Sequence, residues 1–126
     1  MSFATVINCM DGRVQLPVIT YLMKKFGVDY IDSITEPGPV KILAETINRE
    51  NLQSIIQRIN VSVKKHGSKK LALIAHFDCA GNPEPDNIQK IQLLQAIKNL
   101  KELVDSSVEV IGLWVDSDYS FTELSS

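Results

Sequence analysis

Residues 71–75 read Leu-Ala-Leu-Ile-Ala, and His-Phe-Asp-Cys follows directly at 76–79. An uninterrupted apolar run of this length is typical of a β-strand that is buried on both of its faces. Such strands lie inside parallel sheets, where helices cover both sides. The run therefore predicts an interior strand of a parallel sheet, with His76 and Cys79 just beyond its carboxyl end.

Working outward, the rest of the chain alternates short strands with longer helical patterns. Runs rich in β-branched and other apolar residues predict three further strands, at 3–8, 30–34 and 108–115. Apolar residues spaced three and four apart predict helices over 16–26, over 40–66 with a break near 48, and over 86–104. Residues from 117 onward are polar and predict a short edge element or a tail.

Particular residues are expected to set the ends of these helices. Pro17 suits a first helical turn because it has no N–H group to leave unpaired there. Gly27 and Gly67 are expected to end the first and second helical segments. Asp86 is expected to cap the last helix with its side chain.

The alternation of strands and helices predicts an α/β fold, an open and mostly parallel sheet of four to five strands with helices on both faces. The 126 residues fit one domain spanning 1–126. In sheets of this kind, ligands bind outside the carboxyl ends of the strands. We therefore expect the functional residues at that edge.

Composition excludes several classes of function. Hydrophobic residues make up 44% of the chain and charged residues 22%, which is typical of a globular protein and not of a disordered one. The net charge is −2 and lysine and arginine form no basic stripe, so we expect no nucleic-acid partner. No apolar run approaches the roughly 20 residues that span a bilayer. The start of the chain does not resemble a signal peptide. We therefore expect a cytoplasmic protein without a membrane partner.

Two short motifs carry the residues with distinctive chemistry. Cys9 follows the first predicted strand and is followed by Asp11 and Arg13, while His76 and Cys79 follow the buried third strand. Two thiolates and one imidazole are a ligand set that favours Zn²⁺. Three protein ligands leave a fourth position open, as in catalytic zinc sites. Asp11 is close enough to Cys9 for its carboxylate to lie beside the metal, where Arg13 can hold it.

Each of these residues also has an ordinary structural interpretation. A cysteine at the end of a strand is often only a small buried side chain, and His-x-x-Cys occurs by chance. Asp11 and Arg13 alone could form a surface ion pair of little energetic value. The joint occurrence at one sheet edge favours the zinc site. His66 is interpreted as a solvated residue at a helix end, and Trp114 as a core residue.

The two motifs resemble those of the β-class carbonic anhydrases, which carry Cys-x-Asp-x-Arg after the first strand and His-x-x-Cys after a later one. The segment Val-Ile-Gly-Leu-Trp-Val-Asp at 110–116 is similar to the last core strand of that family. The resemblance covers about residues 5–116. It implies a zinc lyase in which Cys9, His76 and Cys79 bind the metal and a zinc-bound hydroxide hydrates carbon dioxide reversibly to bicarbonate. It also implies that Asp11 orients the hydroxide, that Arg13 fixes Asp11, and that the protein forms a homodimer or higher oligomer.

The chain departs from the family pattern after its second predicted strand. The family usually has Arg-Asn-Ala-Gly-Gly there, whereas this chain has a stretch that we expect to be a loop, Thr-Glu-Pro-Gly-Pro at 35–39. We expect this loop to roof the metal cleft and to bring the Glu36 carboxylate towards the metal. A negative charge there would raise the pKa of the zinc-bound water. The expectation is therefore weak hydration of carbon dioxide, greatest at alkaline pH.

Three other functions remain open at this point. The chain could act on another small electrophile, such as carbonyl sulfide or carbon disulfide. It could bind zinc without turnover, with Asp11 as a fourth ligand. Cys9 and Cys79 could instead form a redox-active thiol pair that works without zinc.

Overall fold

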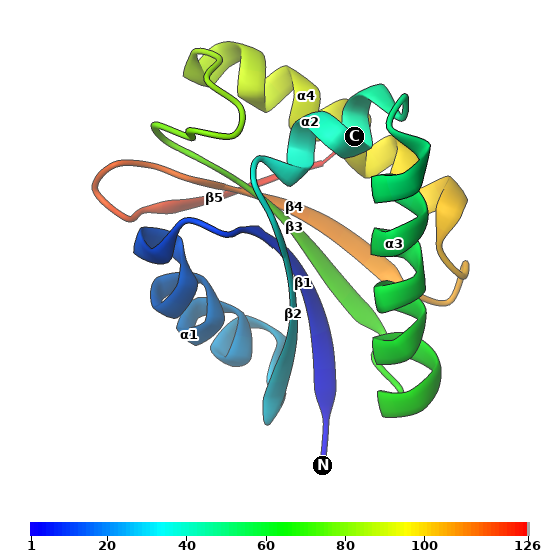
Figure 1. Ribbon diagram of the computed structural model, residues 1–126. Helices are drawn as coiled ribbons and strands as arrows, with labels where there is room; N and C mark the ends of the chain where they lie inside the picture. Colours follow the sequence, from blue (N-terminus) through cyan, green and yellow to red (C-terminus); the bar gives the residue numbers. More distant parts are fainter. Residues whose placement is uncertain (126) are drawn as a thin grey trace.

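The computed structural model describes residues 1–125 and contains one five-stranded sheet (Figure 1). The strand order is β2-β1-β3-β4-β5, in which the first four strands run parallel and β5 runs antiparallel to β4. The strands are β1 (Phe3–Cys9), β2 (Tyr30–Glu36), β3 (Lys70–His76), β4 (Glu109–Val115) and β5 (Phe121–Leu124). The predicted α/β class and mostly parallel sheet are confirmed.

Helices connect the parallel strands. They are α1 (Gln15–Phe26), α2 (Pro39–Glu45), α3 (Arg49–Asn60) and α4 (Asp86–Leu103), with a short 3₁₀ turn at Gly12–Val14 and a π-helical turn at Val61–Lys65 that prolongs α3. The predicted break near residue 48 is confirmed, because Asn48 caps α3 with its side chain. Gly27 ends α1 in the left-handed conformation that glycine favours. Asp86 was wrongly expected to be a side-chain cap, since it is the first residue of α4 and Pro85 holds the cap position.

The helices lie on both faces of the sheet, with α1 alone on one face and α2, α3 and α4 on the other (Figure 1). Each face has its own apolar core. Val18 and Leu22 of α1 pack against one face, while Trp114 of β4 lies in the core of the other and is 2% exposed. The core position of Trp114 is confirmed. Strand β3 is buried along six of its seven residues, as its continuous apolar run predicted.

One prediction about the end of an element is wrong, and one about the end of the chain is confirmed. Strand β2 continues to Glu36, so Thr35 and Glu36 belong to the strand and not to the loop that follows it. The register pairs Glu36 with Cys9, the last residue of the neighbouring strand. The polar segment after residue 117 does form a short edge strand, β5. Within residues 1–125, none of the helices has both the length and the apolar character needed to cross a membrane.

Candidate metal centre

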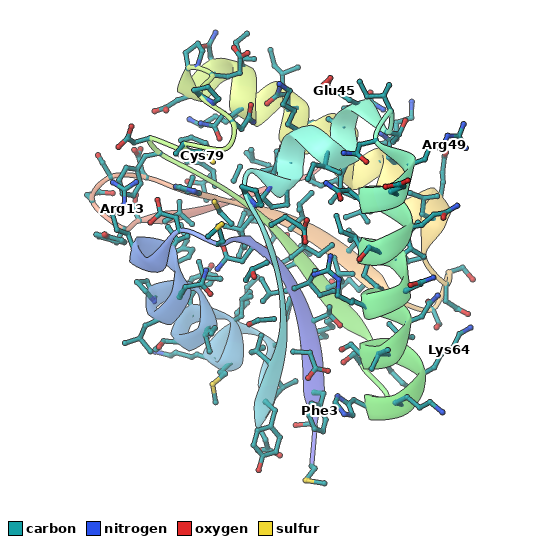
Figure 2. The ribbon with its side chains drawn as sticks, viewed as in Figure 1. Phe3, Arg13, Glu45, Arg49, Lys64 and Cys79 are labelled. Carbon is teal, nitrogen blue, oxygen red and sulfur yellow. The ribbon has the colours of Figure 1, made fainter. Side chains whose placement is uncertain are left out.

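The two sequence motifs meet because β1 and β3 are neighbours in the sheet. Cys9 is the last residue of β1, and His76 is the last residue of β3. The next turn brings Cys79 back beside them, and Figure 2 shows Cys79 and Arg13 near the same edge of the sheet. The ligand atoms of Cys9, His76 and Cys79 all lie within 4.8 Å of one another, and all three residues are buried. This is the one such cluster among the described residues.

The two sulfur atoms have the spacing of metal ligands. The Cys9 Sγ and Cys79 Sγ atoms are 3.8 Å apart, and neither cysteine is in a disulfide. Two sulfur atoms that bind one tetrahedral zinc ion at about 2.3 Å are about 3.8 Å apart. Contact with the Cys79 thiol lowers the pKa of Cys9 to about 4 against the opposing effect of burial, and the His76 side chain and the backbone of Gly38 and Asp11 also lower it. The same contact and burial raise the pKa of Cys79.

His76 presents a free nitrogen atom to this cluster. Its Nδ1 atom lies 2.6 Å from the carbonyl oxygen of Phe77, which can only accept a hydrogen bond. In the neutral ring, Nδ1 therefore carries the proton and Nε2 carries a lone pair. Nε2 is buried and has no hydrogen-bond partner. A buried acceptor without a partner is costly, and a metal ion would satisfy it. The residues therefore fit a zinc ion.

Asp11 and Arg13 form a close ion pair beside the cluster. Arg13 Nη2 lies 2.6 Å from Asp11 Oδ2, and Arg13 Nε lies 3.1 Å from Asp11 Oδ1. These charge-assisted hydrogen bonds lower the pKa of Asp11 to about 2, so its carboxylate is ionised at neutral pH. Asp11 is not a member of the three-residue cluster. Its carboxylate is thus turned towards Arg13.

A hollow of about 330 Å³ opens beside Cys9. It is lined by Cys9, Met10, Asp11, Gly12, Pro37, Ala80 and Gly81. Most of this lining is apolar, and apart from Cys9, whose sulfur atom belongs to the cluster, Asp11 is the one lining residue with an ionisable side chain. The hollow is therefore suited to a small uncharged molecule.

Two loops close one side of the hollow with their backbones in contact. A Cβ atom on Gly81 would lie 2.5 Å from the carbonyl carbon of Pro37, and a Cβ atom on Gly38 would lie 2.7 Å from that of Gly81. Only glycine fits at such an approach. Gly38 also has a positive φ of 60°. This contact joins the loop after β2 to the turn that follows Cys79.

The expected position of Glu36 is wrong. Its Oε2 atom lies 2.7 Å from Nη2 of Arg58 on α3, and Glu36 does not line the hollow. The loop after β2 does reach the cleft, but through Pro37. The carboxylate of Glu36 is therefore neutralised by Arg58. The explanation that it raises the pKa of a zinc-bound water is not supported.

The interpretation of His66 as a solvated residue at a helix end is confirmed, since its side chain is 40% exposed, but the residue also makes specific contacts. Its Nδ1 atom lies 2.6 Å from Asp32 Oδ2, and its ring stacks on Phe3 at a centroid distance of 4.1 Å. His66 thus ties the end of the α3 segment to β2 and to the start of the chain.

Sequence reasoning missed two residues that support the site. The Gln15 side chain donates hydrogen bonds to the carbonyl groups of Cys9 and Asp11, which fixes the turn after β1. Asp78 has a positive φ of 48°, and its carbonyl oxygen accepts a hydrogen bond from Arg13 at 3.1 Å. In the sequence, the position of Asp78 between His76 and Cys79 was the one indication that it belongs to the site.

Comparison with known protein families gives one match that covers nearly all of the chain. A family model described as "Putative carbonic anhydrase" matches residues 1–125. No curated protein matches the chain.

Solved structures show which fold the chain shares. It is similar to the β-carbonic anhydrase isoform I from Trichomonas vaginalis, with 14% identity, 95% of this chain and 80% of that chain covered, and a TM-score of 0.66. It is also similar to a carbonic anhydrase from Streptococcus mutans, with 17% identity, coverage of 94% and 80%, and a TM-score of 0.62. A third similar structure, from a study of two tetrameric β-carbonic anhydrases of Sordaria macrospora, has 12% identity, coverage of 98% and 81%, and a TM-score of 0.67.

Proposed function

Because the chain belongs to the carbonic anhydrase family represented by the matching model, we propose that it is a zinc enzyme that hydrates carbon dioxide reversibly to bicarbonate. The observation that carries the proposal is the cluster of two thiols and one imidazole within 4.8 Å, whose Nε2 atom is buried without a partner. Family membership supplies the reaction class, and the cluster supplies a place for the metal.

Cys9, His76 and Cys79 would hold the zinc ion. When bound by three protein ligands, zinc makes water reactive at neutral pH by lowering its pKa to about 7. The protein contributes the orientation of the ligands. The Phe77 carbonyl group fixes the His76 ring, and the backbone of Gly38 helps to lower the pKa of the Cys9 thiol.

Asp11 and Arg13 would act on the reacting water and not on the metal. The Asp11 carboxylate is ionised at neutral pH and lines the hollow, so it can accept a hydrogen bond there and orient the attacking oxygen atom. Arg13 holds the carboxylate by two nitrogen atoms. Arg13 is thus the positioning residue for Asp11.

The apolar lining of the hollow supports a second candidate substrate class. Carbonyl sulfide and carbon disulfide are also small, uncharged and linear, and the lining residues offer no group that would select carbon dioxide among the three. The second candidate is therefore hydrolysis of one of these molecules at the same site.

We further propose that residues 1–126 form one domain and that the protein acts in the cytoplasm as a homodimer or higher homo-oligomer. The similarity to Sordaria macrospora enzymes described as tetrameric supports an assembly of several copies. We propose no nucleic-acid or membrane partner.

The test is metal analysis of protein purified without chelators, followed by a carbon dioxide hydration assay. We expect about one zinc ion per chain and hydration that is lost on chelation and restored by zinc. Zinc-loaded protein that hydrates none of the three candidate substrates would instead support a non-catalytic zinc-binding protein. Full activity in zinc-free protein would contradict the proposed metal centre.

A further inference from the structure

Arg13 contacts both arms of the candidate metal centre. Its Nη2 atom lies 2.6 Å from the Asp11 carboxylate on the arm after β1. The same nitrogen atom lies 3.1 Å from the carbonyl oxygen of Asp78, on the arm after β3. Its Nη1 atom lies 3.4 Å from the Asp78 carboxylate. The guanidinium group therefore bridges two segments that are far apart in the sequence.

The exposed ion pair with Asp78 adds little to holding Arg13 in this position. The Arg13 side chain is 44% exposed and that of Asp78 is 84% exposed. Ion pairs of this kind contribute little, because solvent screens them and two long side chains must be ordered. The pair with Asp11 holds the guanidinium group at one edge, and a contact on its face would fix its orientation further.

The ring of Phe77 provides such a contact. The Arg13 Cζ atom lies over this ring, 4.9 Å from its centroid, which is a cation–π arrangement. The backbone of Phe77 is itself fixed, because its N–H group donates to the carbonyl oxygen of Val115 at 3.0 Å. In the sequence, Phe77 comes directly after His76 and before Cys79, the two proposed ligands of this arm. The residue that orients Arg13 is thus built into the metal-binding arm.

Tyr119 supports Phe77 from the turn between β4 and β5. The two rings meet edge to face, with centroids 5.8 Å apart and an interplanar angle of 88°. This is a favoured geometry for aromatic pairs. The turn is ordered by hydrogen bonds in which the Tyr119 N–H donates to Asp116 at 2.8 Å and the Asp116 N–H donates to Ser120 at 3.0 Å. The β4–β5 turn therefore reaches the metal centre through two aromatic rings.

We propose that Phe77 and Tyr119 are positioning residues that hold the Arg13 guanidinium group against Asp11. Their effect is to keep the Asp11 carboxylate turned towards Arg13 and free to act on the substrate water. The catalytic role assigned to Arg13 and Asp11 in this inference rests on the proposed function. The arrangement of the side chains is independent of turnover and can be tested without it.

The test follows the Nε–H signal of Arg13 by NMR in zinc-loaded protein. Arg13→Lys identifies the signal, because Arg49 and Arg58 are the other arginines of the chain. Phe77→Leu removes the aromatic face at similar volume, and Phe77→Tyr retains it. In Phe77→Leu we expect the signal to shift towards that of a free arginine and to exchange faster with water. In Phe77→Tyr we expect the signal of the unmodified protein.

Phe121→Leu is a matched control, since Phe121 stacks on Tyr21 at 4.1 Å and belongs to the strand after the same turn. It should leave the Arg13 signal unchanged. In Phe77→Leu, zinc content should stay the same while kcat falls by about two- to fivefold, which corresponds to one exposed cation–π contact. If Phe77→Leu does not fold, Tyr119→Leu at its exposed position gives the same test.

An Arg13 signal that is identical in the unmodified protein and in the folded leucine variant would overturn the proposal. So would a loss of zinc in Phe77→Leu that accounts for the whole loss of activity. Zinc-loaded unmodified protein without hydration activity would contradict the proposed function instead. In that case the NMR comparison still decides whether the aromatic rings position Arg13.

Discussion

The buried Nε2 atom of His76 and the sulfur atom of Cys79 are the two ligand atoms contributed by the arm after β3. Without a metal, Nε2 has no hydrogen-bond partner, and the Cys79 thiol has only the Cys9 sulfur atom as a side-chain partner. Metal binding therefore satisfies groups that folding leaves unsatisfied. We expect the stability of the chain to depend on the metal through these single residues.

Cys79→Ser tests this dependence. Loss of a residue that hydrogen-bonds to a metal ligand lowers metal affinity by about 10–100-fold. Cys79→Ser removes a ligand itself, so the zinc affinity should fall by more than that. The melting temperature should fall with it. Zinc content and thermal unfolding, measured on the same sample, check the prediction. Asp11→Asn is the control, since it alters the carboxylate and leaves the three ligands intact. Equal zinc content in Cys79→Ser and unmodified protein would contradict it.

Arg13→Ala should change the titration of Asp11. The hydrogen bonds from Arg13 lower the pKa of Asp11 from its ordinary value of 3.8 to about 2, so its loss should return the pKa towards 3.8. Because the folded pKa is lowered, the ion pair stabilises the protein fully above pH 3.8 and ceases to do so as the pH falls through 2. The carboxyl carbon of Asp11, followed by NMR, checks the shift. An unchanged titration would mean that Arg13 does not hold Asp11.

Glu36→Gln should leave the pH dependence of any hydration activity unchanged. Glu36 is bound to Arg58 on α3 and does not line the hollow. We expect only a small loss in the free energy of unfolding, about 0–1 kcal/mol, from the lost ion pair. A pH–activity profile and a denaturant titration check both statements. A clear shift of the profile to lower pH would place the carboxylate near the metal after all.

Among the elements, the buried strand β3 was the most predictable. Its apolar run at 71–75 requires cover on both faces, which predicts a strand inside a parallel sheet. Cys9 and His76 both follow parallel strands, so the sequence predicts that they lie at the same carboxyl edge, and the pairing of β1 with β3 brings them together. The ion pairs of Glu36 with Arg58 and of Asp32 with His66 could not be predicted. Both depend on how α3 packs over β2, and no local sequence pattern records that contact. The end of β2 was missed for a related reason, because pairing with β1 extends it into polar residues.

The close contact between the loops at Gly38 and Gly81 leads to a prediction about stability. Gly81→Ala would place a Cβ atom 2.5 Å from the Pro37 backbone, so one of the loops must move. We expect a loss of about 1–3 kcal/mol in the free energy of unfolding, as for overpacking in a core. Gly12→Ala is the matched control for stability, because nothing lies within 4 Å of its Cβ position. Denaturant titrations of both variants check the difference, and equal losses would contradict it.

Across the whole molecule, the candidate metal centre joins two neighbouring strands at one edge of the sheet. Cys9 and Cys79 lie in the core beside α1, and the rest of both cores is built from apolar side chains that do not bind the metal. The effect of zinc should therefore be confined to the edge of the sheet where β1 and β3 end. The sheet itself should persist in zinc-free protein.

Hydrogen exchange with and without zinc tests this separation. Removal of zinc should speed exchange in residues 9–13 and 76–82, and should leave the interior of β3 and β4 protected. The two segments should respond together, because one ion links them. A uniform loss of protection throughout the sheet would show instead that the metal supports the entire fold.

The position of β1 between β2 and β3 also bears on how the protein is made. Cys9 leaves the ribosome early, while His76 and Cys79 follow only after β2 and the helices α2 and α3 have been synthesised. No short nascent segment can assemble the three ligands. For most of translation the Cys9 thiol is therefore without its ligand partners and open to oxidation. The metal can bind to all three ligands only after β3 has paired with β1. The order in which the strands are synthesised therefore sets the earliest point at which the ion can bind.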